Sequence, residues 1–115
     1  MYMIRDALKG NLDLLVLAVL SDGPKHGYAV IEALRTRSRD VFDLPEGTVY
    51  PALHRLEEGG LLSSEWSEIN GRRRRTYQLT EAGHGAHEDE LEAWDEFTDA
   101  VANVVRRRVG WPATS

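Results

Sequence analysis

The feature that most constrains the fold is a long amphipathic stretch at the C-terminal end, residues 81–110. Its apolar residues recur at helical spacing: Leu91, Trp94, Phe97 or Thr98, Val101, and Val104 or Val105. Thr80 can cap the N-terminus, where the positive helix end favours Glu81. Residues 106–108 are arginines, which suit the negative end, and Gly110 and Pro112 end the helix.

A helix of roughly 28 residues would extend about 42 Å, at 1.5 Å per residue. A domain of about 100 residues has a radius of gyration near 13 Å, so in this 115-residue chain the helix has to protrude. Its apolar stripe would be exposed in a monomer, which predicts a homodimer. The residues expected at the dimer interface are Leu91, Trp94, Phe97, Val101 and Val105, with Leu8, Leu12 and Leu15 of the first helix.

Two helices are expected near the N-terminus. Residues 7–21 carry apolar side chains on almost all sides, which predicts a helix buried on most faces. Asp22-Gly23-Pro24 ends this helix. A second helix is expected over residues 26–37, because Val30, Ile31 and Leu34 recur at helical spacing.

A third helix has two distinct faces. It should begin near Gly47 or Thr48, with Pro51 in its first turn, and end at residues 59–60, which are both glycine. The inward face comprises Val49, Ala52, Leu53 and Leu56, and the outward face comprises Tyr50, Pro51, His54, Arg55 and Glu58. An outward face that carries a tyrosine, a histidine and an arginine is typical of a surface that reads DNA.

A β-hairpin is expected next, because both residues of Asn70-Gly71 tolerate a positive φ. A two-residue loop gives these pairs: Ile69 with Arg72, Glu68 with Arg73, Trp66 with Arg75, Ser64 with Tyr77, and Leu62 with Leu79. Arg73 would then face Glu68, and Arg75 could stack on Trp66. Arg72 and Arg74 would point the other way, toward phosphate or the minor groove.

The expected order is three helices, a β-hairpin and a long helix, a mainly α fold. It predicts a winged helix-turn-helix over residues 1–80 and a dimerisation helix over residues 81–110, joined in one compact unit. The net charge of −5 does not exclude a DNA partner, since charge is unevenly distributed. Residues 72–75 are all arginine, whereas acidic residues are concentrated in residues 81–99. The attraction of the DNA backbone depends on the charge of the nearby surface more than on the net charge of the whole molecule.

Composition limits the remaining classes of protein. Apolar residues make up 42% of the chain, and it contains no cysteine, which excludes disulfides and thiolate sites. The longest apolar run, residues 14–20, is too short to span a bilayer, and the N-terminus does not resemble a signal peptide. We therefore expect a cytoplasmic protein.

Several stretches, in this order, resemble the PadR family of transcriptional regulators, specifically its short subgroup with a single C-terminal helix. They are residues 8–10 (LKG), 22–28 (DGPKHGY), 42–53 (FDLPEGTVYPAL), 56–57 (LE), 60–62 (GLL), 71–77 (GRRRRTY) and 79–83 (LTEAG). The resemblance covers nearly the whole chain. It implies a dimeric repressor that binds DNA and often responds to a phenolic acid, a drug or a cellular stress.

The resemblance also implies roles for individual residues. Thr48, Tyr50 and Pro51 would approach the DNA backbone and major groove, and the start of the second helix would touch phosphates beside it. The full set of expected DNA contacts is Lys25, His26, Tyr28, Thr48, Tyr50, Pro51, His54, Arg55, Arg72 and Arg74. A winged-helix module that binds proteins and not DNA is the alternative.

Two further sites have competing interpretations. Trp94 either packs as an ordinary apolar residue of the stripe or, as the resemblance implies, lines with Leu14 a pore that binds flat aromatic effectors. His84, His87 and Glu88 are a weak metal set because no further ligand is evident, so we expect no metal or other cofactor. No catalytic constellation is present, which predicts a protein that is not an enzyme.

Overall fold

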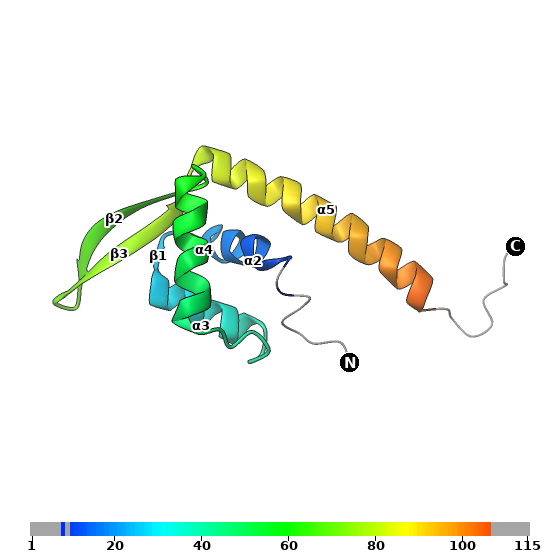
Figure 1. Cartoon of the computed structure of the whole chain (residues 1–115), viewed down its shortest axis with the longest axis horizontal. Coiled ribbons are helices and arrows are strands. Elements are labelled where there is room, and N and C mark those ends of the chain that lie inside the picture. The colour runs from blue at the N-terminus through cyan, green and yellow to red at the C-terminus, as the bar shows by residue number, and fades with distance from the viewer. Residues whose placement is uncertain (1–7, 9, 107–115) are drawn as a thin grey trace, which may run out of the picture.

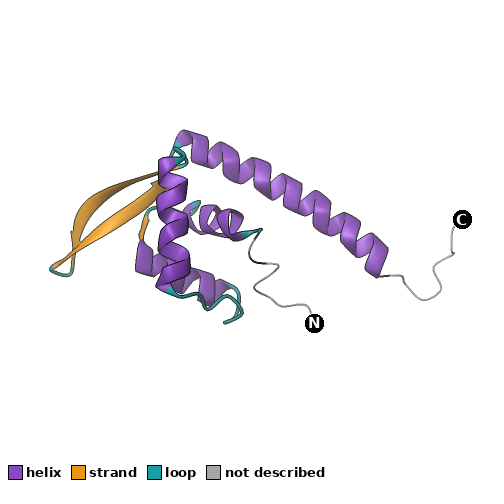
Figure 2. Ribbon diagram, in the orientation of Figure 1, coloured by secondary structure: helices purple, strands orange, loops and turns teal. Residues whose placement is uncertain are grey.

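The computed structural model describes residue 8 and residues 10–106 (Figure 1). Its elements, in chain order, are α2 (Leu12–Leu20), β1 (Lys25–His26), α3 (Gly27–Arg37), α4 (Glu46–Glu58), β2 (Leu62–Ile69), β3 (Arg72–Leu79) and α5 (Glu81–Val105). Figure 2 shows a cluster of helices with a small sheet on one side and α5 leading away on the other. This arrangement confirms the predicted winged helix-turn-helix with a long C-terminal helix.

The first helix is shorter than the sequence predicts. A turn at Gly10-Asn11, in which the Asn11 amide donates to the Leu8 carbonyl at 2.8 Å, precedes α2, so the expectation of one continuous helix over residues 7–21 is wrong. The Asn11 carbonyl then accepts the first helical bond, from the Leu15 amide at 3.1 Å. The expected helix over residues 26–37 is confirmed as α3, with His26 as its cap.

Helix α4 begins at Glu46, slightly earlier than predicted, because the Pro45 carbonyl accepts the amides of Thr48 and Val49. Pro51 is therefore the sixth residue of the helix, and its predicted place in the first turn is wrong. The predicted end is confirmed, since the Gly59 amide closes the helix on the Arg55 carbonyl at 3.0 Å.

The hairpin of β2 and β3 is the wing, and its predicted register is confirmed at every pair from Leu62↔Leu79 to Ile69↔Arg72. The turn residues Asn70 and Gly71 have φ of 53° and 76°, the left-handed values that a tight hairpin turn requires. Strand β1, which the sequence analysis did not predict, adds a third strand on β3 through Lys25↔Tyr77 and His26↔Thr76. The wing is thereby joined to the start of α3.

One apolar core unites α2, α3, α4 and the base of the wing. Its buried residues include the four predicted for the inward face of α4, together with Tyr77 and Leu79 from the wing. Leu12 and Leu15 are half-buried and pack against this core from α2. The core buries one face of α4 and leaves its other faces for contacts with neighbouring elements and with solvent.

Helix α5 is anchored at its start, packs against α2 and then leaves the domain. The Thr80 hydroxyl accepts from the Gly83 amide at 3.0 Å, which confirms the predicted cap, and donates to the Gly60 carbonyl at 2.7 Å. A Cβ at Gly83 would lie 2.0 Å from the Leu61 carbonyl oxygen, so glycine allows the close approach. The protein measures 63 × 30 × 21 Å, consistent with the predicted protrusion of α5 (Figure 1).

Candidate nucleic-acid interface

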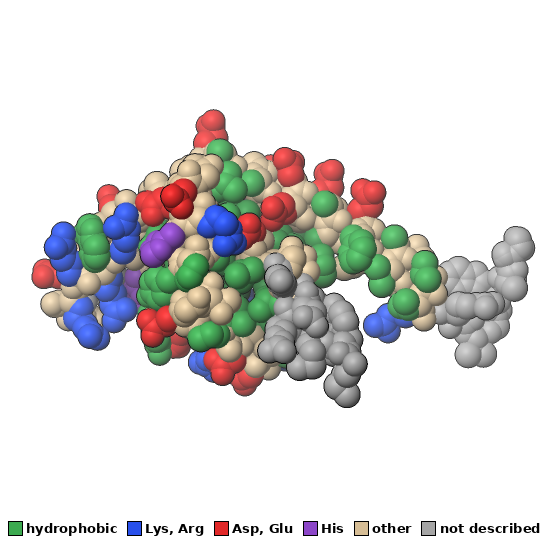
Figure 3. Space-filling view, viewed as in Figure 1, with side chains coloured by type: hydrophobic (Ala, Val, Ile, Leu, Met, Phe, Trp, Pro, Cys, Tyr) green, Lys and Arg blue, Asp and Glu red, His purple; other side chains and the backbone are tan. Residues whose placement is uncertain are grey.

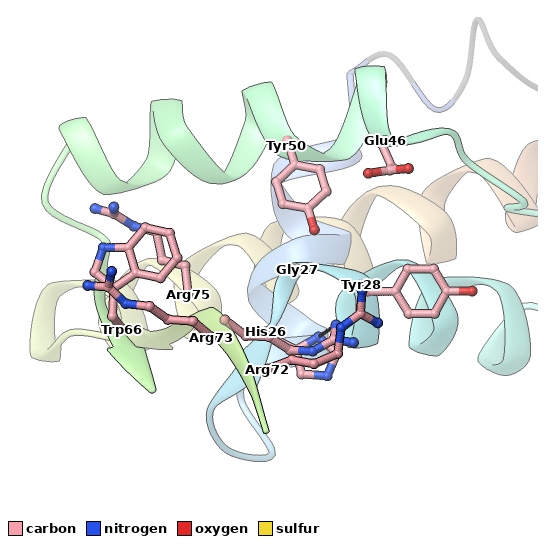
Figure 4. Close-up of a pocket in the computed structure, with 10 residues that line it drawn as sticks. His26, Gly27, Tyr28, Glu46, Tyr50, Trp66, Arg72, Arg73 and Arg75 are labelled. Atoms are coloured by element: carbon pink, nitrogen blue, oxygen red, sulfur yellow. Dashed lines mark hydrogen bonds between the residues drawn. The ribbon is translucent and has the colours of Figure 1, made fainter. Parts of the chain in front are cut away.

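An open groove of about 660 Å³ lies where the starts of α3 and α4 meet the wing (Figure 4). It is lined by His26, Gly27, Tyr28, Glu46, Tyr50, Trp66, Arg72, Arg73, Arg74 and Arg75. Basic side chains gather at the wing end of the molecule, and acidic side chains mark the upper edge along α5 (Figure 3). The charge separation expected from the sequence is therefore present in space.

His26 joins the wing to the start of α3. Its Nδ1 accepts the Ala29 amide at 3.2 Å and lies 3.4 Å from a guanidinium nitrogen of Arg74. Burial, and then the charge of Arg74, lower the pKa of His26. The ring is accordingly neutral near pH 7, and because Nδ1 is an acceptor, Nε2 carries the proton. That N–H is a hydrogen-bond donor beside the groove.

Tyr50 extends from α4 toward the start of α3 (Figure 4). The contact depends on Gly27, where an added Cβ would lie 2.4 Å from Cε1 of the tyrosine ring. Burial, and then the carboxylate of Glu46, raise the pKa of Tyr50, so the phenol keeps its proton and can donate a hydrogen bond. The His54 ring lies 6.4 Å from the Tyr50 ring, one turn further along the same side of α4.

The four arginines of the wing divide into two pairs. Arg73 and Arg75 place their guanidinium carbons 4.8 and 5.6 Å from the centre of the Trp66 ring, as Figure 4 shows. Arg75 also donates to the Ser64 hydroxyl at 2.8 Å. The predicted stacking of Arg75 on Trp66 is confirmed, whereas Arg73 turns to the same ring and forms no ion pair with Glu68 within the described residues.

Arg72 and Arg74 lie on the opposite face of the hairpin, as the confirmed register requires. Arg74 contacts His26. Arg72 is exposed and forms no hydrogen bond, ion pair or ring contact with the part of the chain that the structure describes. Among the four arginines of the wing, Arg72 is therefore the one with the fewest interactions within the described residues.

The groove brings together five of the expected DNA contacts: His26, Tyr28, Tyr50, Arg72 and Arg74. Thr48, Pro51 and His54 lie on α4 outside the lining, and Lys25 is half-buried in β1. Arg55 is placed differently, in a 2.5 Å ion pair with Asp13 of α2. The sequence did not predict that Gly27 and Glu46 line the groove, although both lie at the helix starts that the sequence predicted.

A second cleft, of about 450 Å³, lies between α2 and α5. Its lining includes Leu14, Trp94 and Phe97, and the two aromatic rings are 6.3 Å apart at an interplanar angle of 39°. Asp13 and Glu90 line the same cleft. Burial, and then the charge of Asp13, raise the pKa of Glu90.

The apolar stripe of α5, which includes the two aromatic residues of this cleft, is open to solvent. Phe97 is 61% exposed and Val105 66%, and Leu91, Trp94 and Val101 are also exposed. Leu8, by contrast, is buried within its own chain. An exposed stripe of this length on one helix is typical of a surface that packs against another protein chain.

No other class of site emerges from the described residues. Within residue 8 and residues 10–106, no group of three or more histidine, aspartate or glutamate side chains is arranged to hold a metal ion. Over the same part of the chain, no helix is long and apolar enough to cross a membrane.

Comparison with known proteins identifies the family. Residues 16–89, more than half of the chain, match the Transcriptional regulator PadR-like family. The chain belongs to this family. The Mycobacterium tuberculosis protein "Transcriptional regulator Rv3488" is 36% identical over 98 residues, which cover 85% of this chain and 89% of the relative.

Solved structures agree with the family assignment. A transcriptional regulator from Clostridium thermocellum superimposes with a TM-score of 0.78 at 29% identity, covering 89% of this chain and 99% of the other. A PadR family regulator from Eggerthella lenta gives a TM-score of 0.78 at 29% identity, covering 92% and 91%. PadR-like proteins are DNA-binding transcriptional regulators and not enzymes, so this PadR-like chain is assigned to DNA-binding regulation.

Proposed function

We propose that this PadR-like protein is a cytoplasmic repressor that binds an inverted-repeat operator as a homodimer. The observation that carries the proposal is the position of two surfaces. The basic groove and wing lie at one end of the molecule, and the open apolar stripe of α5 lies at the other (Figure 3). A dimer formed through α5 would present two grooves related by two-fold symmetry, which matches the symmetry of a palindromic site.

In this proposal the start of α4 enters the major groove. The protonated hydroxyl of Tyr50 and the N–H of His26 donate to DNA beside it, and Arg72 lies on phosphate or in the minor groove. Thr48, Pro51 and His54 lie along α4 within reach of the same duplex. Lys25 and Tyr28, at the start of α3, contact the adjoining backbone.

The apolar surface of α5 that a single chain exposes to water supports the proposed dimer. Apolar side chains at Leu91, Trp94, Phe97, Val101 and Val105 are exposed in the single chain. Burying a fully exposed apolar side chain contributes about 1.5–3 kcal/mol, so each of these partly exposed side chains would gain a fraction of that amount. We assign residues 1–80 to the DNA-binding part and residues 81–110 to dimerisation, acting as one unit. Leu12 and Leu15 would meet the partner's α5 only with the parts of their side chains that the core leaves exposed.

Selection of genomic fragments with purified protein, followed by footprinting, tests the proposal. We expect an inverted repeat whose half-sites are about one helical turn, ~10 bp, apart or a multiple of it. Protection of a single unrepeated half-site would contradict the homodimer. Recovery of no preferred fragment would favour the alternative of a winged-helix module that binds proteins.

The cleft between α2 and α5 is the proposed effector site. Trp94, with Leu14 and Phe97 beside it, offers a flat ligand an aromatic surface, and offset stacking contributes about 0.5–1.5 kcal/mol beyond burial. Because both α4 helices depend on the dimer for their separation, a ligand that prefers one arrangement of the subunits would change operator affinity. The coupling is reciprocal, so operator DNA should weaken ligand binding by the same factor.

Quenching of tryptophan fluorescence by planar phenolics and polyaromatic compounds tests the effector site. The measurement uses a chain with Trp66→Phe and Trp111→Phe, so that Trp94 alone reports. We expect quenching in this chain, and it should weaken when operator is added. The control is Trp94→Phe in the chain that keeps Trp66 and Trp111, whose remaining fluorescence should not be quenched. Quenching in that control places the ligand elsewhere, and no quenching of Trp94 leaves it as an apolar contact of the dimer.

A further inference from the structure

Arg55 has a role that differs from the one its place on α4 predicts. We infer that Arg55 is a positioning residue, whose ion pair with Asp13 of α2 sets the orientation of α4 relative to the dimerisation helix α5. The inference rests on the proposed function, because orientation matters only if two α4 helices must match two half-sites. Arg55 would then affect operator binding without touching DNA.

The position of Arg55 around α4 supports this role. At 100° per residue, Arg55 lies about 140° from Tyr50, so the two side chains occupy opposite flanks of the helix. The Tyr50 flank faces Gly27 and the groove, whereas Arg55 is absent from the groove lining. A guanidinium nitrogen of Arg55 is instead 2.5 Å from the Asp13 carboxylate, 42 residues away in the sequence.

Asp13 lies where three helices meet. It belongs to the first turn of α2, and it lines the α2–α5 cleft together with Glu90 and Trp94 of α5. The ion pair therefore joins α4 directly to the part of α2 on which α5 packs.

Apolar packing alone leaves α4 some freedom that this contact removes. The core holds α4 through Val49, Ala52, Leu53 and Leu56, which lie on one face. Rotation about that face is resisted on the groove flank by Tyr50 against Gly27 and on the other flank by Arg55 against Asp13. Losing the second contact should widen the range of α4 orientations while the core and the dimer persist.

Operator affinity of the full chain tests the inference, with Kd measured at several salt concentrations for Arg55→Ala, Asp13→Ala and the double variant. Both partners are partly exposed, and pairs of this kind contribute about 0.2–1 kcal/mol, which converts to a change of up to about fivefold. We expect each single variant to weaken binding about two- to fivefold and the double variant to weaken it no further. The salt dependence should keep the wild-type slope.

A second readout separates positioning from a general structural effect. The measured quantity is the ratio of Kd for an operator whose half-site spacing is altered by one base pair to Kd for the natural operator. This ratio should be smaller for the variants than for wild type, and the exchange Arg55→Asp with Asp13→Arg should restore it. Arg35→Ala, which breaks the 2.9 Å ion pair with Asp40, is the matched control and should leave both readouts unchanged.

Two results would overturn the inference. A salt slope lowered by about one in Arg55→Ala, with Asp13→Ala unchanged or tighter, would show a direct phosphate contact. Wild-type Kd and discrimination in all variants would show that the pair positions nothing. Wild-type protein that binds no operator would instead refute the proposed function itself, so the two failures are distinguishable.

Discussion

Replacing Gly27 with alanine tests how the groove positions its central tyrosine. The added Cβ would lie 2.4 Å from Cε1 and 2.6 Å from Cζ and the hydroxyl of Tyr50, so the ring has to move. Displacing a side chain from its rotamer costs about 0.5–1.5 kcal/mol. Gly27 is the first residue of α3, so alanine gains less here than the roughly 1 kcal/mol that it gains over glycine in a helix interior. The free energy of unfolding should therefore fall by at most about 1.5 kcal/mol.

Operator binding should weaken although the protein stays folded. Loss of one side-chain contact to a base costs about 1–3 kcal/mol, which corresponds to about a 5- to 150-fold rise in Kd. The assay is fluorescence anisotropy with a labelled operator, run beside thermal melting. Gly85→Ala is the matched control, since its Cβ would meet nothing within 4 Å and it lies on α5 away from the groove.

A cycle with Tyr50→Ala identifies the cause of the loss. If Gly27→Ala acts by displacing the Tyr50 ring, adding it to Tyr50→Ala should weaken operator binding no further. Wild-type affinity in Gly27→Ala, or full additivity with Tyr50→Ala, would refute the assignment of Tyr50 to the DNA surface.

The other predictions concern charge. Arg72→Ala should weaken binding to all DNA sequences and lower the slope of the salt dependence by about one, at an unchanged melting temperature. Arg75→Ala should instead lower the melting temperature by several degrees, because it loses contacts with Trp66, Ser64 and Glu57. Equal effects of the two variants on stability and on DNA binding would contradict the division of the wing arginines into two pairs. The pKa of His26 is lowered in the folded state, so its contribution to stability is present above the unfolded value of 6.5 and is lost as pH falls below it, because the unfolded chain binds the proton first. His26→Asn keeps a capping side chain without titrating, so its urea midpoint relative to wild type should rise as the pH falls from 8 to 5. A difference that does not change with pH would contradict the lowered pKa of His26. The pKa of Glu90 is raised from 4.5, so the ionised carboxyl lowers stability above the folded pKa; Glu90→Gln should be more stable than wild type at pH 7 but not at pH 3.5, and an equal gain at both pH values would contradict the role of charge.

The parts of the fold that follow from local chemistry were predictable from sequence. Asn70-Gly71 fixes a two-residue turn, and the turn fixes every pair of the wing. Thr80 caps α5 because its hydroxyl serves the third residue of the helix, a local interaction. The stripe from Leu91 to Val105 predicted an exposed apolar surface because its period is that of a helix.

The parts that depend on distant residues were not predictable. Strand β1 has two residues and no measurable period, and it exists because β3 lies beside it. The ion pair of Arg55 with Asp13 requires the relative placement of α4 and α2, which no local pattern contains. Register places Arg73 opposite Glu68, but its guanidinium lies over the Trp66 ring, because register does not determine the rotamer of a long side chain.

Sedimentation of the protein with a short duplex that contains the selected operator tests the central claim most directly. We predict a complex of two chains per duplex for wild type, since α5 is proposed to pair the subunits. Val101→Glu places a charge on the exposed stripe of α5 and should give monomers that bind the operator too weakly to sediment with it. A wild-type complex of one chain per duplex, or a Val101→Glu monomer that binds the operator as tightly as wild type, would contradict the account.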